Sequence, residues 1–297
     1  MMPWRPILLA LVAAVTVTSA APIPQPADNS TDRSCNGHPS LCSKRYSDVV
    51  YIGAHNSYSW GQGISSDQTA TVSEQLRAGV RLLQNQAHDF PHPYGPDYTN
   101  PSNIHLCHTS CYLLDGGGLE AYLSPVRVWL ADNPNEVLTI LLTNPDGLNI
   151  TRFDQALRFN HLHELAYVPP KAKMTHDDWP TLEEMIDSGR RLVVFIDSGA
   201  DQKRVPYILD EFSQVYENPY DQLGLPLNCS HDRGSDPANS LFLLNNTKDK
   251  SVGPISVPDK ASVDTVNSAN GPNGIVQTVQ RCAKEEGGKK ATFVLVE

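Results

Sequence analysis

The chain of 297 residues carries 33 acidic side chains against 23 Lys and Arg, which gives a formal net charge of -10. It contains no basic stripe, and this excludes a nucleic-acid partner, because contact with a phosphate backbone needs clustered Lys and Arg. The same acidity disfavours broad docking on anionic bilayers, so we expect at most transient contact with a membrane surface.

The first residues predict export from the cell. Arg5 precedes an apolar run from Ile7 to Val17, and small residues at 19–21 supply a cleavage site. The run is too short for a membrane span, which needs roughly 20 residues. We therefore expect a signal peptide over residues 1–21 and a secreted, extracellular protein.

The rest of the chain divides into a short leader and one folded domain. Residues 22–34 are rich in Pro and polar side chains, which is typical of a disordered leader. Residues 35–297 suffice for one large α/β barrel or two modest domains. From Val49 onward, strand-like and helix-like patterns alternate, as they do in βα units with a parallel sheet.

The expected elements follow in chain order. Eight strands are predicted, at Val49–Ile52, Arg81–Gln86, Ile104–His108, Val137–Thr143, Leu165–Val168, Arg191–Asp197, Leu241–Asn245 and Ala291–Val296. Helical patterns lie between them, at Val72–Ala78, Leu119–Ala131, Val205–Phe212 and Gly274–Ala283. A further helix is expected to begin near Thr181, because Thr181 and Glu184 have the spacing of a capping box.

Eight alternating units predict a single (β/α)8 TIM-type barrel of the α/β class over residues 35–297. We expect it to be irregular and incomplete after the last strand, since no helix follows Val296. An open doubly wound sheet is the alternative, but no Gly-rich fingerprint follows an early strand.

Cysteines and sequons agree with export. The even set of cysteines suits disulfides and comprises Cys35, Cys42, Cys107, Cys111, Cys229 and Cys282. Fifteen pairings are open from their number alone. Glycans are expected at the sequons of Asn29, Asn149 and Asn245, whereas the sequon of Asn228 is weakened by Cys229 inside it.

Polar side chains stand where the expected strands end. In a barrel of this type, the C-terminal ends of the strands line the active face. That rule selects His55, Gln86, His108, Thr143, Asn144, Asp197 and Asn245. For Asp197, a role in the site and a structural role are equally well supported.

Two of the selected residues are histidines, and they would project into one bowl. A histidine pair can divide the acid and base duties of a phosphoryl or acyl transfer near neutral pH. Each of them can instead be an ordinary hydrogen-bonded residue. The segment "HLCHTSC" also offers zinc ligands in His105, Cys107, His108 and Cys111, but export favours a disulfide there.

An ordered set of segments resembles a known family. "YIGAHNSY", "LRAGVRLLQNQAH", "HLCHTSC" and "LEAYLSPVRVWLADNPNEVLTILL" resemble the X-region barrel of phosphatidylinositol-specific phospholipase C. They are more closely similar to the secreted fungal PLC-like phosphodiesterases, and the likeness extends from about Cys35 to Glu297.

The resemblance implies roles for single residues. It implies that His55 is the general base that deprotonates the attacking hydroxyl and that His108 is the general acid that protonates the leaving alkoxide. In the family, the reaction forms a cyclic or linear phosphate and releases diacylglycerol. The resemblance also implies the pairs Cys35–Cys42, Cys107–Cys111 and Cys229–Cys282, of which the second would stiffen the loop carrying His108.

This chain has neutral residues at several positions where the family has charged ones. Calcium-dependent members use an Asn after the first His, present here as Asn56, with acidic residues where this chain has Gln84, Gln86 and Thr143. Calcium wants several carboxylate oxygens, so we expect no bound metal and no cofactor. Metal-free members place an Arg at the position of Gln86, and His88 is our candidate for a substitute cation.

These points predict a secreted phosphoric diester hydrolase with His55 and His108 as catalytic residues. The residues expected to bind substrate are Asn56, Gln84, Gln86, His88, Thr143, Asn144 and Asp197. The expected partner is a small phosphodiester or phospholipid headgroup, bound by a monomer. A catalytically weakened binding module is the alternative, and a glycoside hydrolase ranks last because only Asp197 is well placed among carboxylates.

Overall fold

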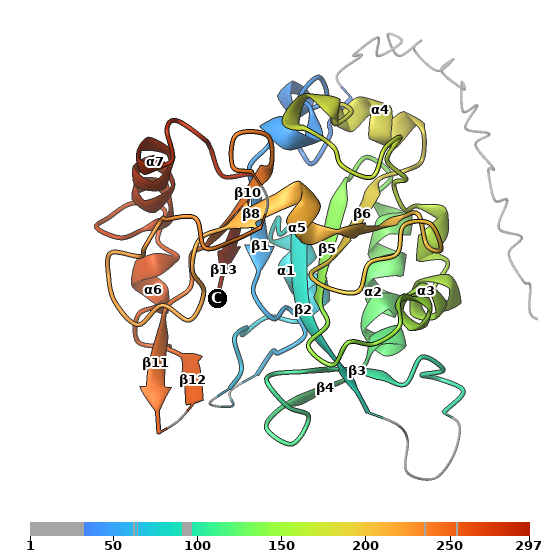
Figure 1. The fold of residues 1–297 in the computed structure, drawn as a ribbon, viewed down its shortest axis with the longest axis horizontal. Helices are drawn as coiled ribbons and strands as arrows, with labels where there is room; N and C mark the ends of the chain where they lie inside the picture. The colour runs from blue at the N-terminus through green and yellow to red at the C-terminus, as the bar shows by residue number, and fades with distance from the viewer. Residues whose placement is uncertain (1–32, 62, 64, 91–96, 235, 254) are drawn as a thin grey trace, which may run out of the picture. The chain divides into compact units, whose positions relative to one another are not determined.

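A computed structural model describes residues 33–61, 63, 65–90, 97–234, 236–253 and 255–297 (Figure 1). The predicted signal peptide, residues 22–32 of the predicted leader and the sequon at Asn29 lie outside the described residues. Arg33 forms an ion pair with Asp187 of the folded domain.

Eight parallel strands form one curled sheet. In chain order they are β1 (Tyr51–Ala54), β2 (Leu82–Asp89), β5 (Leu138–Thr143), β6 (Leu192–Ile196), β7 (Ile208–Asp210), β8 (Val215–Glu217), β10 (Leu241–Asn245) and β13 (Phe293–Val296). Each strand pairs with its successor, and β13 returns to β1, except that no ladder joins β7 to β8 within the described residues. The irregular α/β barrel is confirmed, with one open seam.

Shorter strands extend this sheet or stand apart from it. They are β3 (Ile104–Cys107), β4 (Asp115–Gly118), β9 (Arg233–Gly234), β11 (Asp249–Val252) and β12 (Ile255–Pro258). The segment Ile104–His108 was expected as a barrel strand, and that prediction is wrong, because β3 runs antiparallel to β2. A parallel return needs a crossover that is usually a helix, and the described residues between β2 and β3 form none.

Two further sequence predictions fail in the middle of the chain. Leu165–Val168 makes only a single bridge, between Ala166 and Leu192, and the prolines that follow Val168 lack the N–H a strand needs. Val205–Phe212 was expected as a helix but contains β7, and only its last two residues are helical, at the start of α5 (Glu211–Gln214). Ile208 and Leu209 are both fully buried, and a short apolar run does not distinguish a buried strand from a helix.

Helices cover the outside of the sheet (Figure 1). The α-helices are α1 (Val72–Arg77), α2 (Leu119–Asp132), α3 (Ile150–Phe159), α4 (Leu182–Asp187), α5 (Glu211–Gln214), α6 (Val263–Val266) and α7 (Ile275–Glu285). Short 3-10 helices occur at Pro39–Leu41, Tyr46–Asp48, Leu162–Glu164 and His176–Asp178. The capping box predicted at Thr181 and Glu184 is confirmed at the start of α4.

The core has two layers, which follow from the alternation of side chains along each strand. On β5, Ile140 and Leu142 pack outward with the apolar faces of α2 and α3. Leu141 points the other way, into a cluster that includes Tyr46 and Trp179, whose ring centroids lie 4.7 Å apart. Residues 35–49 and α4 thus close one end of the sheet. The C-terminal ends of the strands, at the other end, are left for a site (Figure 1).

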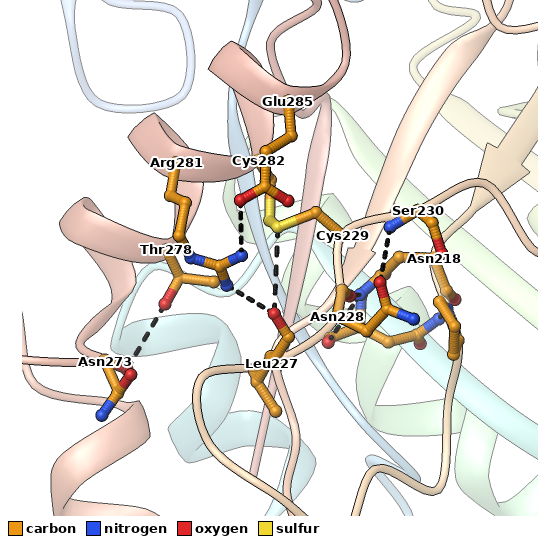
Figure 2. Close-up of a disulfide and its surroundings, with 12 residues drawn as sticks. Asn218, Leu227, Asn228, Cys229, Ser230, Asn273, Thr278, Arg281, Cys282 and Glu285 are labelled. Carbon is orange, nitrogen blue, oxygen red and sulfur yellow. Dashed lines mark hydrogen bonds and ion pairs between the residues drawn. A yellow bond between two sulfur atoms is a disulfide. The ribbon is translucent and has the colours of Figure 1, made fainter.

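Three disulfides join Cys35 to Cys42, Cys107 to Cys111, and Cys229 to Cys282, so the predicted pairing is confirmed. Figure 2 shows the third bridge, which ties α7 to the loop that follows β8. Arg281 of α7 donates to the carbonyl of Leu227 beside the bridge. The loop is therefore held to α7 by a covalent bond and by a hydrogen bond.

No helix among the residues described combines the length and the apolar character that crossing a bilayer requires.

We expect the Cys229–Cys282 bridge to stabilise the fold more than the Cys107–Cys111 bridge does. The two bridges close segments with sequence separations of 53 and 4 residues. On the chain-entropy model, their loss should lower the free energy of unfolding by about 4 and about 2 kcal/mol, respectively. Urea unfolding of the two double Cys→Ala variants measures this order, and a larger loss for the Cys107/Cys111 variant would contradict it.

Candidate active site

A cavity of about 340 Å³ opens at the C-terminal ends of the parallel strands. Seven residues expected at the site or on the active face line it, namely His55, Gln84, Gln86, His88, Thr143, Asp197 and Asn245. A larger cavity of about 620 Å³ includes Lys44, His176 and Lys289 and lies at the other end of the sheet. Because barrels of this kind carry their chemistry at the C-terminal face, the smaller cavity is the candidate active site.

His55 directly follows β1 and faces two carboxylates. Its Nδ1 lies 3.6 Å from Asp67 Oδ1 and 3.5 Å from Glu297 Oε1, and both carboxylate side chains are fully buried. Its Nε2 lies 3.3 Å from the side-chain nitrogen of Asn56, which can only donate. These contacts favour the tautomer with the proton on Nδ1, so that Nε2 is the unprotonated nitrogen of the ring and accepts from Asn56, while the ring itself lines the cavity.

His108 follows β3 and approaches the same carboxylate from the other side. Its Nε2 lies 3.8 Å from Asp67 Oδ1, and its Nδ1 lies 3.4 Å from the hydroxyl of Thr109. The side chain of His108 is buried and does not line the cavity, whereas its neighbour Thr109 does. The fold therefore brings the two predicted histidines together around one oxygen, but only His55 reaches the cavity.

The surrounding charges give the two rings different proton affinities. Burial lowers the pKa of His55, but a hydrogen bond with Glu297 and the negative charges of Asp67, Glu297 and Asp249 outweigh it and raise that pKa to about 9. Burial and the charge of His55 lower the pKa of His108 to about 4. Burial also raises the pKa of Asp67 to about 7, so near neutral pH Asp67 and His55 compete for a proton while His108 stays neutral.

Gln84 and Gln86 of β2 support the two histidine loops. The side-chain oxygen of Gln84 accepts from the backbone N–H of Asn56 at 2.7 Å, and that of Gln86 accepts from the backbone N–H of Thr109 at 2.9 Å. Asn56 and Thr109 both adopt left-handed backbone conformations, with φ values of 40° and 61°. This conformation is strained for a β-branched residue such as Thr109, so the contact with Gln86 helps to hold the loop of His108 in place.

Two residues expected to bind substrate lie beneath the cavity instead. Asn56 is fully buried, and its type suits the left-handed turn that follows His55. The side chain of Asn144 accepts from the backbone N–H of Leu148 at 2.8 Å and donates to its carbonyl at 3.0 Å. Both asparagines therefore shape the loops around the cavity and do not line it.

Asn245 lines the cavity, and the glycan predicted there is wrong for the folded chain. Its side chain is buried and donates to Glu217 Oε2 at 3.2 Å and to the carbonyl of Asn218 at 2.9 Å, which leaves no room for a sugar. Asn149 is exposed and caps α3 through a hydrogen bond from the backbone N–H of Thr151. A glycan at Asn149 stays a prediction.

Sequence reasoning missed a charged group on the far side of the cavity. Arg233 of β9 forms a 2.7 Å ion pair with Glu217 at the end of β8, and its guanidinium lies 4.4 Å from the ring centroid of Tyr220. All three residues line the cavity. Glu217 ends a strand that the sequence analysis did not assign, and Arg233 lies on a two-residue strand without any pattern.

The neutral residues at the family's calcium positions are already engaged. The side-chain oxygens of Gln84 and Gln86 accept from backbone N–H groups, and the Thr143 hydroxyl lies 3.5 Å from the carbonyl of Asn85. Calcium takes six to eight oxygen ligands and favours carboxylates. These three side chains therefore do not fit that ion.

Comparisons with known proteins agree with this architecture. The PI-PLC X family matches residues 41–297. A PI-PLC X domain-containing protein 1 from Arthroderma benhamiae is 40% identical over 278 residues, which cover 92% of this chain and 86% of that protein. An uncharacterized secreted protein of the same fungus is 32% identical over 292 residues and covers 95% of this chain, which spans 63% of that protein.

One solved structure is similar in fold. It is titled phosphatidylinositol-specific phospholipase C from Listeria monocytogenes, and the alignment covers 86% of this chain and 90% of that one. The TM-score is 0.55 at 13% sequence identity. At this identity, the likeness concerns the arrangement of helices and strands alone.

Proposed function

The chain belongs to the PI-PLC X family, and we propose that it is a secreted phosphoric diester hydrolase that acts on a phospholipid or a related small phosphodiester. The observation that carries the proposal is the approach of His55 and His108 to one oxygen of Asp67 beside the cavity. Three disulfides and a relative described as secreted support an extracellular location.

His55 is the general base of the proposed reaction. Its Nε2 takes the proton of the attacking hydroxyl, and the new bond forms between that oxygen and phosphorus. Asp67 and Glu297 stabilise the imidazolium that results, in the way a buried carboxylate supports the histidine of a catalytic triad. The ring acts as a base when its Nε2 carries no proton, a state it reaches when Asp67, whose pKa burial raises to about 7, holds the proton instead.

His108 is the general acid, and it gives its proton to the alkoxide as the bond between phosphorus and the leaving oxygen breaks. Its lowered pKa leaves the ring neutral near neutral pH, so it acts as an acid only after it has taken up a proton, which it then gives up readily. It reaches the leaving group after its ring turns from Asp67 toward the cavity. Because Asp67 Oδ1 lies 3.6 Å from His55 and 3.8 Å from His108, one carboxylate can pass a proton between the rings and restore the starting state.

Two groups supply positive charge or a donor for the phosphate. Arg233 lines the cavity. It supplies the positive charge that metal-free family members take from an Arg on β2, where this chain has Gln86. His88 is held by Asp146 Oδ2, 3.3 Å from its Nδ1, and its buried Nε2 has no hydrogen-bond partner in the described structure. Fixed donors of this kind contribute much of the rate in charged transition states. We propose that no calcium ion takes part, since Gln84, Gln86 and Thr143 do not fit it.

A binding module is the second candidate function. Two observations favour it: Glu217 already neutralises Arg233, and His108 does not line the cavity. In that case, the cavity would hold a phosphate headgroup without cleaving it.

We expect the two histidine variants to differ in how they respond to the leaving group. On a diester with an alkyl leaving group, His55→Ala and His108→Ala should each lower kcat/KM by about 100- to 10,000-fold. A nitrophenyl leaving group needs no general acid, so it should restore most of the rate of His108→Ala and little of that of His55→Ala. Steady-state kinetics of both variants on both esters measure this difference.

His105→Ala is the matched control, since His105 lies on the same segment and pairs with Asp115 outside the cavity. It should retain the rate on both esters. If His55→Ala and His108→Ala both keep full activity, neither histidine has its proposed role. If the nitrophenyl ester restores the rate of His55→Ala but not that of His108→Ala, the base and acid roles are exchanged.

We expect Arg233→Gln to lower kcat/KM by about 100-fold, because a cation next to the phosphate is lost. Arg233→Lys should recover part of the rate through its charge. Arg45→Gln serves as the control, because Arg45 is exposed and paired with Asp177 away from the cavity. An unchanged rate in Arg233→Gln would show that this side chain does not stabilise the reaction.

Turnover assays separate the enzyme from the binding module. Purified protein should hydrolyse at least one of phosphatidylinositol, glycerophosphodiesters and sphingomyelin, and a chelator should not reduce the rate. Product analysis by phosphorus NMR and binding by calorimetry are measured on the same samples. Saturable binding without turnover would support the binding module and contradict the enzyme.

A further inference from the structure

A second cavity, of about 220 Å³, adjoins the carboxylates that support His55. Asp67 and Glu297 line this cavity together with Ser66, Thr69, Lys260 and Asp264, and they do not line the substrate cavity. His55 lines the substrate cavity and not the second one. The three side chains therefore form a partition between the two spaces, with the imidazole on one side and the carboxylates on the other.

The donor atoms in this partition are close together. His55 Nδ1, a carboxylate oxygen of Asp67 and a carboxylate oxygen of Glu297 all lie within 4.8 Å of one another. The two distances from His55 Nδ1, 3.6 and 3.5 Å, are close to the spacing of neighbouring ligands around a tetrahedral ion with bonds of about 2 Å. One ion can therefore contact all three groups after small side-chain shifts.

The carboxylates have unmet hydrogen-bonding capacity. The side chains of Asp67 and Glu297 are 0% and 1% exposed, and apart from their contacts with His55 none of their four oxygens has a partner at hydrogen-bond geometry among the described residues. Burying a carboxylate without donors is costly, and two that share a site repel each other. The one lysine of the second cavity, Lys260, donates to the carbonyl of Gly63 instead. A cation held between the two carboxylates would offset this cost.

We propose that His55, Asp67 and Glu297 form a binding site for one divalent transition metal ion, with zinc preferred, and that metal bound there blocks turnover. The block on turnover rests on the proposed function, whereas the metal site does not. The site is separate from the positions where related proteins hold calcium, which here are Gln84, Gln86 and Thr143.

The donor set favours zinc over calcium or magnesium. Imidazole nitrogen and carboxylate oxygen are both zinc ligands, and an open zinc site takes three protein ligands and a water at a tetrahedral centre. Calcium and magnesium prefer oxygen ligands alone and more of them. The second cavity leaves space beside Asp67 and Glu297 for the water.

A metal on Nδ1 would reverse the tautomer of His55. The ion takes the Nδ1 lone pair, so the remaining ring proton lies on Nε2, the nitrogen that the proposed base needs free. An N–H at this place would also face the donor group of Asn56, 3.3 Å away. Because Asp67 and Glu297 do not line the substrate cavity, the ion itself would not contact the substrate. Occupancy of the site is therefore inhibitory.

Metal binding is measured directly on the full chain after treatment with a chelator. We expect zinc to bind with one-to-one stoichiometry in calorimetry and to raise the melting temperature. Cobalt at the same site should show the visible absorption of a four-coordinate ion. Asp67→Asn and Glu297→Gln should each weaken zinc binding by at least about 10-fold.

Asp264→Asn is the matched control, since it removes a carboxylate from the same cavity but not from the ligand cluster. It should bind zinc as tightly as the unchanged protein. Melting curves without metal show whether each variant is folded. If zinc does not bind, or binds to Asp67→Asn and Glu297→Gln as tightly as to the unchanged protein, the site is refuted.

Kinetics test the second half of the inference. Stoichiometric zinc should abolish turnover of the unchanged protein, and a chelator should restore it. Binding without inhibition would confirm the metal site but overturn its effect on His55. If the protein hydrolyses no phosphodiester at all, the proposed function fails, while calorimetry and the cobalt spectrum still decide whether the site exists.

Discussion

Asp67 places a buried carboxylate between two imidazole rings, and the arrangement of the barrel mouth depends on it. One oxygen lies 3.6 Å from His55 and 3.8 Å from His108, and Glu297 adds a second carboxylate 3.5 Å from His55. Because both carboxylates are buried, water screens them weakly, so each charge acts strongly on its neighbours. The result is one ring that holds a proton tightly and another that releases it easily.

Strand β2 holds this arrangement in place. Gln84 and Gln86 point to the same side of the strand because they are two residues apart, and each accepts from the backbone of one histidine loop. The Cys107–Cys111 bridge closes a short loop that contains His108, and this restrains the same loop by a covalent bond. The neutral side chains of Gln84 and Gln86 therefore support the two histidine loops. The sequence had shown only that they replace acidic calcium ligands of the family.

The sequence predicted the features that leave a periodic or local signal. Long apolar strands such as Leu192–Ile196 were found, and the strand-end rule located His55 and Thr143. The three-residue strands β7 and β8 carry no period, so Glu217 at the end of β8 was missed. Asp67 comes from a loop without a motif, and its proximity to both histidines exists only after the chain folds. Arg233, on a two-residue strand, was missed for the same reason.

The open seam between β7 and β8 has a consequence for how such proteins diverge. In the part of the chain that the structure describes, no ladder fixes the register across it. The chain after β8 carries Tyr220 and Arg233 to the cavity on a loop fastened by the Cys229–Cys282 bridge. Insertions or deletions in that loop leave the register of the remaining strands unchanged. The wall of the cavity that carries Tyr220 and Arg233 can therefore change in length and sequence independently of the wall that carries His55.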